Sequence, residues 1–431
     1  MGKIALALIA LSASADGLGA NDGSSSRDAC EADCTGSGDE RRCVFEARLD
    51  IHASSTGYYK FAQCGSTPQP VLAMEQGVEY TFRQKSASNW FHPLGFAYAP
   101  DGAHRGNPEL EPGMTLTGSE CYHSSTCQSP IYFLGNHFLG GTEDGAVRYP
   151  RLANNGDSGL YPYEPRFAVP RPDWQAKRDK ADEGYKVKLT LTDEAYTKDL
   201  FYFCHVHNHM SGRIKLMRRG ESKLLQSADE PKLGYAHEKP SAFDEKCGTY
   251  GLGSFAGEHH CDKGMFTCGE AETEDQKLFV ECLNAMDCAM HEQMRVNVHA
   301  NDPLTTFMQQ MIPHHANAVN MAKALIKLDK TNEGNDPDGE LEHLLWGIVN
   351  VQNMQIHTME AWLADNGRKS FSGAHCEYSG SCHAALNFSV YAISAACVVL
   401  ALLSSVAFLL ARARHVTASG ESPHASTVSK A

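Results

Sequence analysis

The alternation of apolar and polar positions divides the chain into two halves of different character. From about residue 48 to 219 the pattern is typical of β-strands. Residues 71–82 form a strand-like run with a turn at Gly77, and residues 186–191 alternate with a period of two. Gly, Pro, Asn and Asp are dense from 99 to 172, which indicates a long loop-rich insertion. The first half is therefore predicted to be a β-domain.

In the second half the apolar residues recur at helical spacing. They predict helices at 274–298, 304–328 and 339–366, with a polar turn between the last two. Asp302 followed by Pro303 is a typical helix start, because an Asp side chain accepts a backbone N–H and Pro suits the first helical position. This half is therefore predicted to be helical.

The first residues have the form of a signal peptide. Lys3 is followed by an apolar run at 4–11, and Ala13 and Ala15 form a small-residue exit, which predicts cleavage after Ala15. A buried helix is the alternative interpretation. The run is too short to span a bilayer.

A second apolar segment, residues 388–411, carries no charge and has the length of one membrane-spanning helix. Arg412 and Arg414 follow at once, and cations at this position favour the cytoplasmic side. A GPI-anchor signal is the alternative, but its apolar tail would normally end the chain, and a polar tail follows here. We therefore expect a single-pass type I membrane protein of the secretory pathway or cell surface, with most of the chain outside the cytoplasm.

Composition adds a chemical direction to this picture. Of 431 residues, 42% are apolar and 21% are charged, as expected for a packed globular chain. The formal net charge of −14 argues against non-specific nucleic-acid binding, which needs clustered cations, so no nucleic-acid partner is expected. The chain has 15 Cys, 21 His and 14 Met, and these side chains bind soft and borderline metals, copper above all.

Most cysteines of an exported chain are expected to form disulfides, because its compartment is oxidising. Cys397 lies inside the predicted span, and Cys204 stands apart from the clusters that the others form. The connectivity stays open at this point. If Cys204 is a metal ligand, an odd number of cysteines is left outside the span, and at least one further thiol stays unpaired.

The sharpest motif follows a strand-like run in the first half. Cys204, His207 and Met210 have the spacing Cys-x2-His-x2-Met, and Gly212 and another strand follow. A blue-copper site needs a thiolate and two imidazoles in a trigonal plane, with a distant axial thioether. The second imidazole is predicted to come from His92, which follows an earlier strand.

This pattern resembles the cupredoxin family, and the loop spacing is that of its short-loop, amicyanin-like members. The resemblance implies a Greek-key β-sandwich with a type 1 copper held by His92, Cys204, His207 and Met210. The competing interpretation is a disulfide at Cys204 with histidines on the surface. Two features depart from the family: neighbouring histidines flank the loop, namely His205 and His209, and the insertion is longer than a small cupredoxin needs.

A second constellation lies in the predicted helix at 304–328. Met308, Met311 and His315 share one helical face, whereas His314 and Met321 share a neighbouring face. Pro313 removes a backbone donor and is expected to kink the helix just before the two histidines. Thioethers and imidazoles together suit Cu(I), whereas a methionine stripe by itself equally suits core packing.

The Met-Ile-Pro-His-His segment at 311–315 and the later Gln-x3-Ile-x2-Met pattern resemble a ferritin-like helical family of bacterial exported proteins, catalogued as a domain of unknown function, some of whose members bind copper in the periplasm. The resemblance covers about 302–366. It implies an antiparallel helix bundle with candidate ligands at Met308, Met311, His314, His315 and Met321. Gln355 departs from the Glu that is frequent in the family. The predicted bundle lacks paired Glu-x2-His motifs, so a di-iron oxidase is not expected.

Together these features predict a multidomain chain with one transmembrane helix. Its segments are a signal peptide (1–15), a Cys-containing segment (16–47), a cupredoxin-like domain (48–219), a linker or small disulfide-tied unit (220–270), a ferritin-like helical domain (271–367), a juxtamembrane segment (368–387), the span (388–411) and a cytoplasmic tail (412–431).

Three functions are compatible with this organisation. The first is a membrane-anchored extracytoplasmic copper-binding protein, in which one site holds a redox-active copper and a second site stores or passes Cu(I), with a redox or copper-transfer protein as partner. The second is a copper-dependent oxidoreductase such as a cupric reductase. The third is a disulfide-rich surface protein without metal. A multicopper oxidase is not expected, because the His-x-His pairs occur in one loop only. We favour copper binding or electron transfer over a turnover enzyme.

Overall fold

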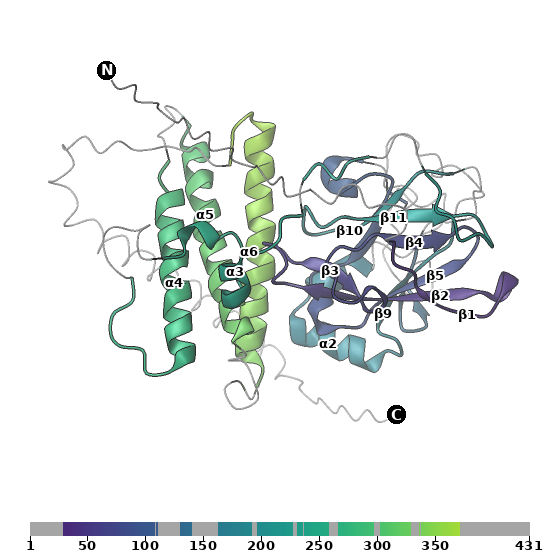
Figure 1. The fold of residues 1–431 in the computed structure, drawn as a ribbon, viewed down its shortest axis with the longest axis horizontal. Helices are drawn as coiled ribbons and strands as arrows, with labels where there is room; N and C mark the ends of the chain where they lie inside the picture. The colour runs from purple at the N-terminus through teal and green to yellow at the C-terminus, as the bar shows by residue number, and fades with distance from the viewer. Residues whose placement is uncertain are drawn as a thin grey trace, which may run out of the picture. The chain divides into compact units, whose positions relative to one another are not determined.

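The computed structural model describes residues 29–107, 109–110, 130–139, 163–191, 196–226, 231–235, 237–257, 266–296, 302–328, 336 and 338–370. Mixed β-sheets formed by the N-terminal part of the chain are followed by C-terminal helices (Figure 1). The predicted signal peptide, span and cytoplasmic tail lie outside the described residues. Within those residues, no helix combines the length and the apolar character needed to cross a membrane.

Two sheets make up the β-domain. The larger consists of β1 (Asp33–Thr35), β2 (Arg42–Asp50), β3 (Tyr58–Phe61), β5 (Glu79–Gln84), β7 (Ile131–Leu134), β8 (His137–Phe138) and β9 (Tyr185–Leu189). Its order is β1-β2-β5-β9-β7-β8, and β3 pairs with β2. The smaller consists of β4 (Leu72–Glu75), β6 (Leu94–Ala97), β10 (Leu200–Cys204) and β11 (Gly212–Met217), in the order β4-β11-β10-β6. The β2–β5 and β4–β11 pairs are parallel.

The strand-like run at 71–82 is confirmed as two strands, but they belong to different sheets. β4 lies in the smaller sheet and β5 in the larger one. Gly77 therefore turns the chain from one sheet to the other. Its φ of +74° lies in the left-handed region, which glycine adopts without steric cost.

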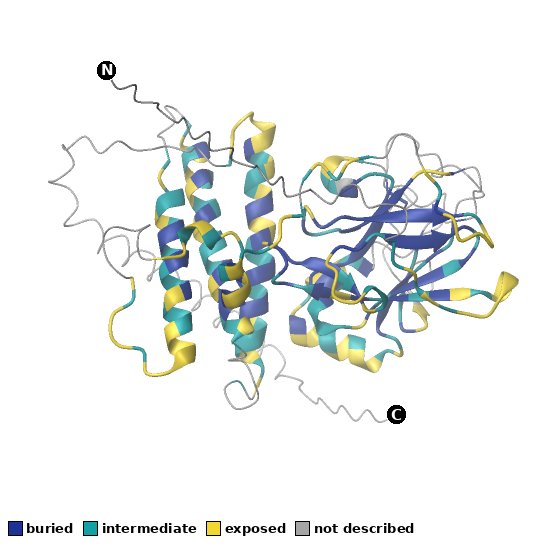
Figure 2. Cartoon of the chain, viewed as in Figure 1, coloured by how far each residue is buried: buried dark blue, intermediate teal, exposed yellow. Residues whose placement is uncertain are grey.

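Aromatic rings join the two sheets into one hydrophobic core. Phe61 of the larger sheet lies 5.1 Å from Tyr202 of the smaller one, and Phe82 lies 4.8 Å from Phe96, measured between ring centroids. All four rings are fully buried. The strands of the smaller sheet are buried at every position (Figure 2). Both faces of this sheet are therefore covered, and the charged residues Arg213 and Lys215 of β11 are buried as well.

The β-domain begins before residue 48, the boundary expected from the sequence. β1 and most of β2 precede that residue, and β2 is central enough to pair with β1, β3 and β5. Two disulfides, Cys30–Cys64 and Cys34–Cys43, tie the N-terminal segment to these strands. The short, cysteine-rich sequence of residues 16–47 does not indicate this pairing, because its strands depend on partners further along the chain.

Part of the long insertion is ordered as regular structure. β7 and β8 extend the larger sheet through β9, and α2 (Arg171–Lys180) follows a 3-10 turn at Glu164–Ala168. The Trp174 ring stacks on Tyr185 at 5.3 Å between centroids. The insertion therefore widens the larger sheet rather than forming loops alone.

Three long helices confirm the prediction for the second half. They are α4 (Glu274–Gln293), α5 (Pro303–Lys327) and α6 (Glu340–Asp365), and they lie side by side (Figure 1). Asp302 caps α5 by accepting a hydrogen bond from the Thr305 backbone N–H, and Pro303 is the first helical residue, as expected. Pro313 lies inside α5, and the helix continues beyond it.

The segment predicted as a linker or a small disulfide-tied unit contains regular structure. It contains α3 (Ala242–Cys247), and a disulfide joins Cys247 to Cys282 of α4. Cys288 is also disulfide-bonded. Among the cysteines that the structure describes, Cys204 and Cys268 are free thiols. The expectation of a further unpaired thiol besides Cys204 is thus met within these residues.

Polar contacts anchor the helices to the β-domain. The buried Lys323 ammonium group of α5 donates hydrogen bonds to the carbonyl oxygens of Ser54 and Ser55, each at 2.6 Å. Asn353 of α6 donates to the same Ser55 oxygen at 3.0 Å. These backbone acceptors belong to the loop between β2 and β3, so the helices hold that loop in place.

The charge on Lys323 is expected to make stability depend on pH. Burial lowers its pKa from 10.5 to about 7, although Asp50 and Asp244 oppose this change. Between these values the unfolded chain binds more protons than the folded chain, so the free energy of unfolding rises with pH, by at most about 1.4 kcal/mol per pH unit. We expect Lys323→Met to remove this rise. Urea unfolding of both proteins from pH 7 to pH 9 tests it, and equal slopes would contradict it.

Candidate metal centre

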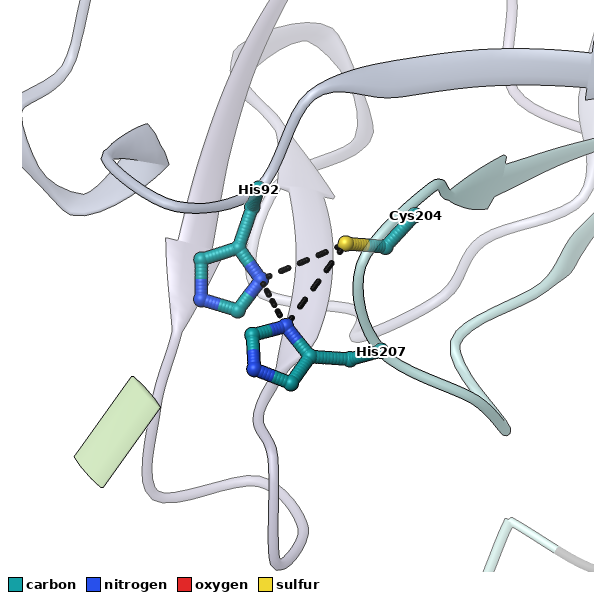
Figure 3. Close-up of side chains that lie close together, drawn as sticks. All are labelled: His92, Cys204 and His207. Atoms are coloured by element: carbon teal, nitrogen blue, oxygen red, sulfur yellow. Dashed lines mark hydrogen bonds between the residues drawn. The ribbon is translucent and has the colours of Figure 1, made fainter. Parts of the chain in front are cut away.

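Three buried side chains converge at one end of the smaller sheet: His92, Cys204 and His207 (Figure 3). Cys204 Sγ lies 3.6 Å from His92 Nδ1 and 3.7 Å from His207 Nδ1, and the two Nδ1 atoms are 3.2 Å apart. Within the described part of the chain, no other group of three His, Cys, Asp or Glu side chains converges in this way.

Strand pairing explains why residues so distant in sequence meet. Cys204 is the last residue of β10 and pairs with Leu94, the first residue of the antiparallel strand β6. The start of β6 and the end of β10 therefore lie side by side at the same end of the sheet. His92 lies just before β6, and His207 lies in the short loop between β10 and β11.

The loop that carries His92 is held by buried polar groups. The His92 carbonyl oxygen accepts hydrogen bonds from Gln84 Nε2 at 2.7 Å and from the Tyr59 hydroxyl at 3.0 Å. Gln84 Oε1 in turn accepts from the Leu94 N–H and the Tyr163 hydroxyl. Phe91, just before His92, has a φ of +69°, a strained conformation for a bulky residue. The surrounding contacts therefore impose the path of this loop.

Asn350 of α6 determines which ring nitrogens face the cluster. His92 Nε2 lies 3.0 Å from Asn350 Oδ1, and His207 Nε2 lies 3.0 Å from the Asn350 backbone oxygen. Asn350 Nδ2 donates to the Trp90 carbonyl, so its Oδ1 faces His92. Both acceptors lack a proton, so each histidine carries its hydrogen on Nε2. The two Nδ1 lone pairs then face the sulfur and each other, an arrangement that suits a cation.

The size of the cluster fits a transition-metal ion. The point equidistant from the three donor atoms lies about 2 Å from each, since the triangle has sides of 3.2, 3.6 and 3.7 Å, and metal–imidazole bonds are about 2.0–2.1 Å long. The donor set of one thiol and two imidazoles therefore fits a metal in a trigonal plane.

Burial keeps the donors uncharged in the absence of a cation. It raises the pKa of the Cys204 thiol to about 12 and lowers the pKa of His207 to about 4. The pKa of His92 is lowered well below its usual value, first by burial and then by His207. A bound metal ion would supply the positive charge that a thiolate needs at this position.

The remaining residues of the predicted loop have separate positions. Met210 is fully buried in the same hydrophobic core as Cys204, and its assignment as the axial ligand stays a prediction. His205 is partly buried but is not in the cluster, and a side chain at Gly95 would come within 2.0 Å of its Nε2. The His209 ring packs against Tyr235 in a tilted arrangement, with ring centroids 4.7 Å apart. Neither of the two competing histidines joins the group of three.

The predicted ligands of the helical half all lie on α5. The His314 and His315 rings are neighbours, with centroids 6.0 Å apart. His314 and Met321 are exposed, whereas Met308, Met311 and His315 are partly buried. His315 Nδ1 is buried without a hydrogen-bond partner in the described structure. The assignment of these five residues as ligands stays a prediction.

Sequence reasoning missed Asn350 as a partner of both histidines. Asn350, Asn353 and His357 recur at i, i+3 and i+7, so they lie on one face of α6, and all three are buried. The regular spacing of these polar residues along one face of the predicted helix was the available signal. His92, one of the two histidines that Asn350 contacts, lies 258 positions away from it in the sequence.

Comparison with known families assigns the helical region. Residues 284–390 match the family described as "Domain of unknown function (DUF305)", and this range includes the second half of α4 together with α5 and α6. The chain therefore contains a DUF305 domain in this region. No curated protein and no solved structure matches the chain significantly. The resemblance of the β-domain to cupredoxins stays a prediction.

The support of the His92 loop can be tested by replacing Gln84. We expect Gln84→Leu to lower the free energy of unfolding by about 3 kcal/mol, because it leaves the Leu94 N–H and Tyr163 hydroxyl without their acceptor and removes one donor to His92. Urea unfolding measures the change. Gln63→Leu, at a partly exposed glutamine, is the control and should cost less than about 1 kcal/mol. Equal losses in the two variants would contradict the role of Gln84.

Proposed function

We propose that this protein is a membrane-anchored, extracytoplasmic copper-binding protein with a type 1-like redox site. His92, Cys204 and His207 would hold the ion, with Met210 as the axial thioether. The observation that supports this most strongly is the convergence of the Nδ1 atoms of His92 and His207 on one buried thiol. The predicted span at 388–411 would be the anchor.

The donor chemistry favours copper over other metals. The cluster contains no carboxylate, which argues against Mg²⁺ and Ca²⁺. Structural zinc sites usually have four tetrahedral Cys or His ligands, whereas a trigonal thiolate and two imidazoles with a nearby thioether is the set that copper uses for electron transfer. Two mixed sheets sharing one core are consistent with a Greek-key cupredoxin-like domain.

Copper, when bound, would supply one-electron redox chemistry at this position. The residues of the chain would exclude water, hold both imidazoles in one tautomer and keep the thiol from forming a disulfide. His92, Cys204 and His207 are all at most 1% exposed, which supports this exclusion of water.

The DUF305 domain would provide a second, Met- and His-containing site for Cu(I), used for copper storage, transfer or tolerance. The exposed positions of His314 and Met321 on α5 support access by an incoming ion. Joining both sites on one chain raises the effective concentration of donor for acceptor, which favours transfer between them. A redox or copper-transfer protein would be the external partner.

The type 1-like site predicts an intense visible band. We expect the full chain, loaded with Cu(II) and desalted, to show a thiolate-to-copper band that reduction bleaches. Cys204→Ser should abolish the band while the fold, followed by circular dichroism, is retained. Cys268→Ser removes the exposed free thiol and should leave the band intact. A band that survives in Cys204→Ser would show that this ligand set is wrong.

The helical site predicts a change in copper stoichiometry. Replacing Met308, Met311, His314 and His315 together is expected to lower the number of Cu(I) ions bound per chain and to leave the visible band unchanged. Metal analysis of the reduced, loaded protein measures this number. A control with Ala at the exposed residues Leu304 and Phe307 of α5 should bind the wild-type amount. Unchanged stoichiometry in the fourfold variant would assign these side chains to packing alone.

A further inference from the structure

One face of α6 completes the surroundings of the metal centre in the β-domain. Asn350 accepts hydrogen bonds from both histidines of the cluster, as described above. Two turns further along α6, His357 Nδ1 accepts a hydrogen bond from the backbone N–H of Asn208, the residue after His207. Helix α6 of the DUF305 domain therefore contacts the loop between β10 and β11 as well as the candidate ligands His92 and His207.

The contacts of α6 enclose the outer edge of His207. The Nε2 side of this ring meets the Asn350 carbonyl, and the His357 ring lies 5.9 Å away between centroids. Phe91 covers another side at 6.0 Å. His207 is consequently 1% exposed. Without α6, the Nε2 edges of His92 and His207 would lose the acceptors that α6 now provides.

We propose that α6 is part of the metal centre, that Asn350 is its positioning residue, and that metal binding and docking of the DUF305 domain are thermodynamically coupled. The proposal rests on the proposed function only in requiring that a transition-metal ion bind His92, Cys204 and His207. It assigns the helical domain a second role, which is to hold the metal-binding form of the β-domain.

The physical basis is the histidine tautomer. An imidazole whose Nε2–H has an acceptor keeps its Nδ1 lone pair free for a metal, whereas an unpartnered imidazole also populates the tautomer with a hydrogen on Nδ1. Loss of such an orienting partner typically lowers metal affinity 10- to 100-fold. Linkage then requires the converse: a bound metal must stabilise the docked position of α6 by the same factor.

The two acceptors of Asn350 can be separated by mutation. The side-chain oxygen serves His92, and the backbone oxygen, which every variant retains, serves His207. Asn350→Ala therefore removes one orienting bond, and Asn350→Asp keeps an acceptor for His92. Asn353→Ala is the matched control, since Asn353 lies on the same face and binds Ser55 but has no described contact with the cluster.

The test measures metal affinity of the full chain by chelator competition, with Cu(II) and separately with Zn²⁺. We expect Asn350→Ala to lose about 10- to 100-fold in affinity and Asn350→Asp to recover most of that loss. Asn353→Ala should lose clearly less than Asn350→Ala, because it removes a docking contact but no orienting bond to a histidine. A purely structural role would make the two alanine variants equal. Wild-type affinity in Asn350→Ala would overturn the proposal.

Hydrogen exchange supplies the second readout, without reference to activity. Metal binding should slow amide exchange in peptides from α6 of the wild type, and less so in Asn350→Ala, with little effect on α4. Amide exchange rates in α6 that are the same with and without metal would overturn the coupling. If Zn²⁺ shows the coupling and copper does not bind, the coupling stands and the copper function fails. If the wild type binds neither metal, both proposals fail.

Discussion

The pairing of β10 with β6 is the interaction on which the candidate centre depends. Because Cys204 pairs with Leu94 in an antiparallel register, the residues just before β6 and just after β10 emerge at the same edge of the sheet. A shift of one residue would turn Cys204 to the opposite face, away from His92. The aromatic core shared by both sheets maintains this register, and Gln84 and Tyr59 of the larger sheet hold the His92 loop against it.

Burial imposes the second constraint. A thiol and two imidazoles in a water-free site cannot easily become charged, and the shifted pKa values of Cys204 and His207 express this. Each ring nitrogen that faces away from the cluster still needs a partner, and Asn350 provides both acceptors. The polar groups of the site are thus satisfied on one side by the protein, and their free lone pairs converge on the other side.

The three disulfides between described cysteines each lie within one half of the chain. Cys30–Cys64 and Cys34–Cys43 stabilise the β-domain, and Cys247–Cys282 joins α3 to α4. The described links between the two halves are hydrogen bonds and not disulfides. They include the hydrogen bonds of Lys323, Asn350 and Asn353. Such contacts can break and form without bond cleavage, so this interface is the part of the fold able to respond to a bound ligand.

Much of the organisation was predictable from the sequence alone because it depends on short-range patterns. Helical periodicity located α4, α5 and α6 to within a few residues, and Asp302–Pro303 predicted the start of α5. The spacing of Cys204, His207 and Met210 predicted a metal-binding loop. Only the tertiary structure revealed that β4 and β5 lie in different sheets, that His205 and His209 stay outside the cluster, and that Asn350 completes it. These features depend on contacts between residues far apart in the chain, and a local sequence pattern does not specify which distant residue is the partner.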